Sequence, residues 1–106
     1  MIDIIKKYFS VWNSHDLDGL SSLFSEDVEL KDWDIHEIGI ARVLKANSNI
    51  FKNVDSIKAE IINIAVSEKK VMVELAVVIN EKDRIDVVDI FEIRGKLIKS
   101  IKAYKC

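Results

Sequence analysis

The fold of this 106-residue chain is decided by one strand-like stretch, Ile85-Asp86-Val87-Val88-Asp89-Ile90-Phe91-Glu92-Ile93. Side chains alternate between the two faces of a strand, so one face carries Ile85, Val87, Asp89, Phe91 and Ile93. A single carboxylate, Asp89, therefore lies in the middle of an otherwise apolar face. A buried carboxylate needs a partner, a metal or a proton. The pattern predicts either a cavity in which Asp89 acts or a hydrogen-bonded structural acid.

A second stretch shows the same anomaly. Residues 27–33 also alternate, and Asp32 shares a face with Val28 and Leu30. Because a shift of one residue would exchange the faces of either strand, the inward placement of Asp32 and Asp89 depends on the register.

The remaining patterns predict an α+β fold in a single domain, residues 1–106. Helical spacing of apolar residues covers 2–14, a second helix runs from its N-cap Asp16 to Phe24, and a third runs from Gly39 to Asn53. Residues 34–39 are expected to be a loop. Strands are predicted at 27–33, 56–66, 71–80, 85–93 and 96–104. We expect the helices to pack on one face of a curved antiparallel sheet.

Composition excludes several classes of function. The net charge is −2 with both signs interspersed, so there is no basic surface for nucleic acid. The lone cysteine, Cys106, cannot form an internal disulfide. No export signal is visible, and no apolar stretch approaches the roughly 20 residues that span a bilayer. We therefore expect a cytoplasmic protein that does not bind membranes.

A long N-terminal motif reads Tyr8-Phe9-Ser10-Val11-Trp12-Asn13-Ser14-His15-Asp16-Leu17-Asp18-Gly19-Leu20, and Leu23-Phe24-Ser25-Glu26-Asp27-Val28 follows it. This motif resembles the opening of the NTF2-like superfamily, and most closely its ketosteroid isomerase and SnoaL-like branch. The resemblance continues through Gly39, residues 88–93, 95–96 and 101–103. It implies a cone-shaped α+β barrel with three N-terminal helices on a curved antiparallel sheet. The same fold serves isomerases, dehydratases, cyclases, hydrolases and non-enzymatic carriers.

The resemblance also implies a catalytic set. The first-helix tyrosine of the isomerase branch matches Tyr8, its catalytic base matches Asp32, and its second aspartate matches Asp89. In ketosteroid isomerase, an ionised aspartate moves a proton next to a carbonyl, while a tyrosine and a protonated aspartate donate hydrogen bonds to the oxyanion. The implied function is that of a small isomerase or lyase acting by enolisation of a hydrophobic carbonyl compound, without cofactor or metal.

Structural alternatives stay open for each residue. Asp89 could bond to backbone or to a tyrosine, Asp32 to the turn that follows it, and the Tyr8 hydroxyl to a partner in the core. The alternative function is a non-catalytic domain that binds a small ligand or another protein. A hydrolase of the epoxide-opening type needs an Asp-Arg-Asp cluster, and neither Arg42 nor Arg84 is obviously placed inward.

Four further residues are candidates for ligand binding: Trp12, Trp33, His36 and Phe91. Trp33 and Asp34 follow the implied base, where the isomerase branch has proline and a small residue, so Trp33 could narrow the mouth of a cavity. Histidine titrates near neutral pH and could act as an acid–base, or His36 could simply be exposed. Both tryptophans could instead serve packing.

The outer face of the sheet is also predicted to be partly apolar. It carries Met72, Glu74, Ala76, Val78, Val88 and Ile90. Such surfaces usually contact another protein, and the resemblance implies a two-fold dimer formed sheet to sheet. We expect a homodimer through this outer sheet face.

Overall fold

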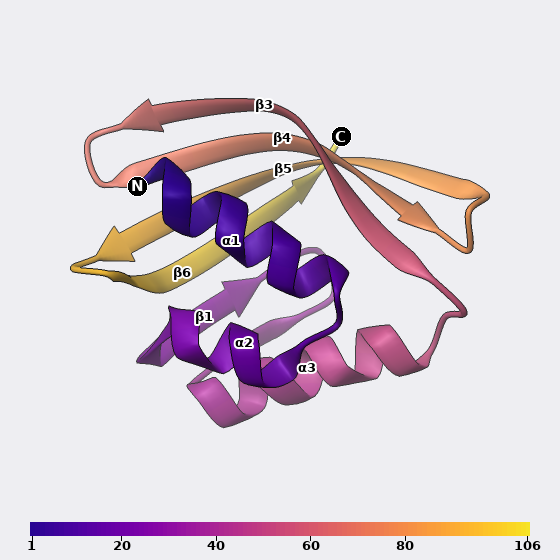
Figure 1. The fold of residues 1–106 in the computed structure, drawn as a ribbon, viewed down its shortest axis with the longest axis horizontal. Coiled ribbons are helices and arrows are strands. Elements are labelled where there is room, and N and C mark those ends of the chain that lie inside the picture. Colours follow the sequence, from indigo (N-terminus) through magenta and orange to yellow (C-terminus); the bar gives the residue numbers. More distant parts are fainter.

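The computed structural model describes residues 1–106 and contains three helices and a six-stranded sheet (Figure 1). The helices are α1 (Ile2–Asn13), α2 (Leu17–Leu23) and α3 (Ile40–Lys52). The strands are β1 (Phe24–Lys31), β2 (His36–Ile38), β3 (Ile57–Ser67), β4 (Lys70–Ile79), β5 (Asp83–Arg94) and β6 (Leu97–Lys105). All three helices lie on the same side of the curved sheet, which confirms the predicted α+β architecture.

The sheet is mixed, with the strand order β2-β1-β6-β5-β4-β3. Strands β3 to β6 form an antiparallel meander, and β1 pairs with β2 in the same antiparallel manner. The pairing of β1 with β6 is parallel, so the prediction of an antiparallel sheet throughout is wrong at this point. A parallel pair needs a long crossover connection, and here β2, α3 and three strands separate the two partners along the chain.

The predicted loop at residues 34–39 is also partly wrong, because His36–Ile38 forms the short edge strand β2. It pairs with the end of β1, where Lys31 lies opposite His36 and Glu29 opposite Ile38. Three residues are too few to show an alternating pattern in the sequence. Phe24 likewise begins β1 instead of ending the second helix.

Local signals explain where the helices begin. The Gly19 amide donates a hydrogen bond to Oδ1 of Asp16 at 3.0 Å, which confirms Asp16 as the N-cap of α2. The chain enters α3 through Gly39, whose φ of 101° is a conformation that other residues rarely adopt. None of the three helices combines the length and the apolar character needed to span a bilayer.

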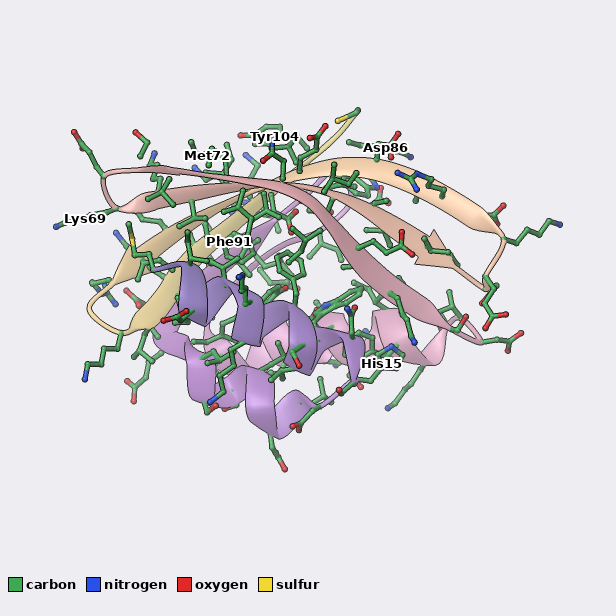
Figure 2. All side chains as sticks on the ribbon, turned by 45° about the horizontal axis from the view of Figure 1, so that its top comes forward. His15, Lys69, Met72, Asp86, Phe91 and Tyr104 are labelled. Atoms are coloured by element: carbon green, nitrogen blue, oxygen red, sulfur yellow. The ribbon has the colours of Figure 1, made fainter.

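The core lies between the helices and the inner face of the sheet. Val87, Phe91 and Ile93 of β5 are buried there, which confirms the predicted register of this strand. The Phe91 ring packs edge-on against Tyr8 and Phe9 of α1, with centroids 5.2 and 5.7 Å apart. In Figure 2 Phe91 points from the sheet towards α1, whereas Met72, Asp86 and Tyr104 project from the opposite face.

Candidate functional site

A cavity of about 310 Å³ lies between the helices and the inner face of the sheet. Sixteen of its twenty lining residues are hydrophobic, and the four polar ones are Asp32, Asp34, Asn47 and Asp89. The cavity reaches solvent at the turn after β1, where the lining residues Trp33 and Asp34 are exposed. Its volume lies at the lower end of the range for small-molecule sites, about 300–1,000 Å³.

Five of the seven residues singled out in the sequence line this cavity: Tyr8, Trp12, Asp32, Trp33 and Asp89. Phe91 does not line it, because the ring is completely buried beneath Tyr8. His36 is exposed, and its Nε2 lies 2.6 Å from Oε2 of Glu29, outside the cavity. No arginine lines the cavity, and no group of three or more His, Cys, Asp or Glu residues is arranged to hold a metal ion.

Asp89 is held on the inner face by both neighbours of β5. It lies opposite Val73 of β4 and Ala103 of β6, and it is only 8% exposed. No protein group forms a hydrogen bond with its carboxyl. Every side-chain nitrogen or oxygen atom that is fully buried does have a hydrogen-bond partner, so the Asp89 carboxyl oxygens are not fully enclosed and face the cavity. Burial, with a smaller effect from the charge of Asp32, raises the pKa of Asp89 to about 7. A carboxyl group with this pKa can act as a hydrogen-bond donor near neutral pH.

Tyr8 projects from α1 towards the same part of the cavity. Its ring is 5% exposed and packs against Phe9 and Phe91, with centroids 5.1 and 5.2 Å away. Burial and then the nearby charge of Asp89 raise the pKa of the Tyr8 phenol above its ordinary value. The phenol therefore stays neutral and available to donate, and no protein group accepts its proton.

Asp32 is oriented by the turn that follows β1. Its Oδ1 accepts hydrogen bonds from the amides of Asp34 at 2.7 Å and Ile35 at 2.6 Å. The Asp32 amide in turn donates to the Ile35 carbonyl at 2.8 Å. These bonds fix the carboxylate while Oδ2 keeps no protein donor. Asp32 thus forms the hydrogen bonds to the following turn that were expected as the structural alternative, and it also lines the cavity.

Asn47 is a lining residue that the sequence analysis missed. Its Oδ1 accepts from Nε1 of Trp12 at 2.9 Å, and its Nδ2 donates to the Val43 carbonyl at 3.0 Å. The available signal was the spacing of α3: Asn47 follows the buried Val43 by four residues, so it interrupts the apolar face of the helix as Asp89 interrupts its strand.

The profile of the SnoaL-like domain matches residues 5–101, nearly the whole chain. The chain belongs to the SnoaL-like domain family. No curated protein matches the sequence.

Several solved structures are also similar to this chain in fold. A candidate polyketide cyclase from Sinorhizobium meliloti is 22% identical, with a TM-score of 0.88 over 95% of this chain and 93% of the other. A candidate ketosteroid isomerase from Kribbella flavida is 16% identical, with a TM-score of 0.86 over 98% and 76%. An LEH-like epoxide hydrolase from M. tuberculosis is also 16% identical, with a TM-score of 0.81 over 99% and 81%. At these identities the likeness shows a shared NTF2-like fold.

Proposed function

We propose that this SnoaL-like domain is a cofactor-independent enzyme that enolises a hydrophobic carbonyl compound in its cavity. One observation carries the proposal: two groups without protein partners, the Tyr8 phenol and the Asp89 carboxyl, whose raised pKa favours its protonated form, open onto the same apolar cavity as the carboxylate of Asp32. A buried acid without a partner is costly for folding, so its presence favours a functional role.

The proposed chemistry assigns one role to each group. The substrate carbonyl oxygen accepts hydrogen bonds from the Tyr8 hydroxyl and the protonated Asp89 carboxyl. Oδ2 of Asp32 then takes a proton from the adjacent carbon, and the electron pair of that C–H bond moves to form an enolate. The two donors stabilise the negative charge as it develops on oxygen. Return of the proton to a different carbon completes an isomerisation, whereas loss of a leaving group gives a lyase reaction.

The environment of the site favours these roles. The largely apolar lining lowers the local dielectric constant, which strengthens the hydrogen bonds to the developing charge. The charge of Asp32 helps to keep Asp89 protonated, so the base supports the donor. The cavity also lacks the arginine of the Asp-Arg-Asp cluster that epoxide opening needs, so enolisation fits this chain better than epoxide hydrolysis.

Proton abstraction can be measured before the natural substrate is known. We would incubate the protein in D₂O with a Δ5-3-ketosteroid and, separately, with 2-tetralone, and follow deuterium incorporation next to the carbonyl by NMR. Asp32→Asn should slow exchange by about 10²–10⁴-fold, and Tyr8→Phe by about 10²–10³-fold. Asp86→Asn, on the outer face of β5, is the matched control and should exchange at the wild-type rate.

The same experiment distinguishes the alternative function. Exchange that is equally fast in the wild type and Asp32→Asn would contradict the proposed base. Binding of both ketones without exchange would favour a ligand-binding domain, which the largely hydrophobic lining would also suit.

A further inference from the structure

The burial of the polar Asn47 side chain is unfavourable for folding. This residue is 3% exposed on the inward face of α3, where Val43 one turn earlier is completely buried. Burying a carboxamide is unfavourable unless its hydrogen bonds are made. An apolar side chain would serve packing at lower cost, so Asn47 calls for an explanation beyond filling space.

The protein satisfies only part of the bonding capacity of Asn47. A carboxamide has two N–H donors and an oxygen with two lone pairs. Trp12 uses one lone pair, and the Val43 carbonyl uses one N–H. One N–H and one lone pair are left, and the side chain lines the cavity, where a ligand can reach it.

Asn47 and the proposed reacting groups come from different elements of the fold. Its partner Trp12 lies four residues after Tyr8 on α1, which corresponds to about 6 Å along the helix axis. Asn47 itself comes from α3, which packs against α2 and β1, whereas Asp89 comes from β5 in the sheet (Figure 1). Asn47 is also the only polar residue of the lining that is not an aspartate.

We propose that Asn47 forms a second polar subsite, and that the substrate is an apolar carbonyl compound with a second oxygen, as a ketone or hydroxyl, bonded to the free N–H of Asn47. This inference rests on the proposed function and narrows its substrate class. The Trp12 bond holds the carboxamide in place, so Trp12 is a positioning residue for the subsite. A ligand lacking the second oxygen leaves the Asn47 donor unpaired and binds less tightly.

Two related probes test the subsite: 2-naphthol, whose phenol resembles an enol, and 6-acetyl-2-naphthol, which adds a second oxygen. Dissociation constants follow from naphthol fluorescence. We expect the acetyl group to tighten binding to the wild type by about fivefold, the effect of one neutral hydrogen bond. Asn47→Leu should abolish this gain while 2-naphthol binds as before. Asn47→Ala provides a second variant that keeps the cavity open, and Asn49→Leu on the same helix, outside the cavity, should keep the gain.

Each outcome has a defined meaning. The subsite is supported if the acetyl group no longer tightens binding to either Asn47 variant but still tightens binding to Asn49→Leu. If the Asn47 variants bind both probes equally more weakly, Asn47 has a purely structural role and the subsite proposal is wrong. The proposal is also wrong if 6-acetyl-2-naphthol still binds Asn47→Leu more tightly than 2-naphthol does. The subsite is tested by the ratio of the two dissociation constants, which does not depend on catalysis. A failure of the deuterium-exchange test and a failure of the subsite test can therefore be told apart.

Discussion

Asp89→Asn should stabilise the folded protein at neutral and alkaline pH. The side chain has an ordinary pKa of 3.8, which the fold raises to about 7 through burial and the charge of Asp32. Each pKa unit corresponds to about 1.4 kcal/mol, so ionising Asp89 lowers the free energy of unfolding by about 4 kcal/mol. Asparagine has nearly the same shape and no charge. Because the Asp89 carboxyl bonds to no protein group, its replacement breaks no hydrogen bond.

The pH dependence of this effect has a definite sign. Below pH 3.8 Asp89 is protonated in both the folded and the unfolded state, so the two proteins should have similar stability. Between pH 3.8 and about 7 the unfolded chain releases the proton and the folded one keeps it. Wild-type stability therefore falls relative to Asp89→Asn by about 1.4 kcal/mol per pH unit. Above pH 7 the difference should stay constant.

Urea unfolding at pH 4 to 9, followed by the fluorescence of Trp12 and Trp33, measures this difference directly. Asp86→Asn is the control, since Asp86 is an exposed acid of the same strand that pairs with Arg84. In Asp32→Asn the fall in stability should end at a lower pH and be smaller, because this variant lacks the second cause of the raised pKa of Asp89 in the folded state. A pH-independent difference between Asp89→Asn and the wild type, or a less stable variant at pH 8, would refute the reasoning.

Further predictions concern packing, capping and association. Phe91→Ala should lower the free energy of unfolding by about 3–5 kcal/mol in urea titrations, because it empties the space beneath two aromatic rings. Asp16→Ala should cost about 1 kcal/mol in the same assay through loss of the α2 cap. Asn13→Ala should cost about 1–3 kcal/mol, because the Asn13 amide both donates to and accepts from the backbone of Ala59 at 3.0 and 2.8 Å. The homodimer through the outer sheet face stays a prediction. If that face is the interface, light scattering should show a dimer for the wild type and a monomer for Ile90→Lys. A monomeric wild type would contradict the predicted dimer.

Part of the candidate site was predictable because strand and helix periods are local properties. Alternation along residues 85–93 placed Asp89 on the buried face, and the structure confirms this because Val87 and Phe91 are buried beside it. Alternation along residues 27–33 likewise singled out Asp32, whereas Tyr8 came only from the resemblance to the isomerase branch, and all three residues line one cavity. The same local logic identified the N-cap Asp16.

Other features depend on contacts between segments far apart in the chain, which no local period encodes. The parallel pairing of β1 with β6 joins residues some 70 positions apart, and β2 exists only because β1 offers it a free edge. Asn47 enters the cavity because α3 packs against β1 and Trp12 lies opposite it. The sequence by itself therefore determined the three helices, the five longer strands and which face of each is apolar, since these follow from the order of neighbouring side chains. Only the tertiary structure decided which strands pair and which polar groups share the cavity, because those follow from how the apolar faces are buried together.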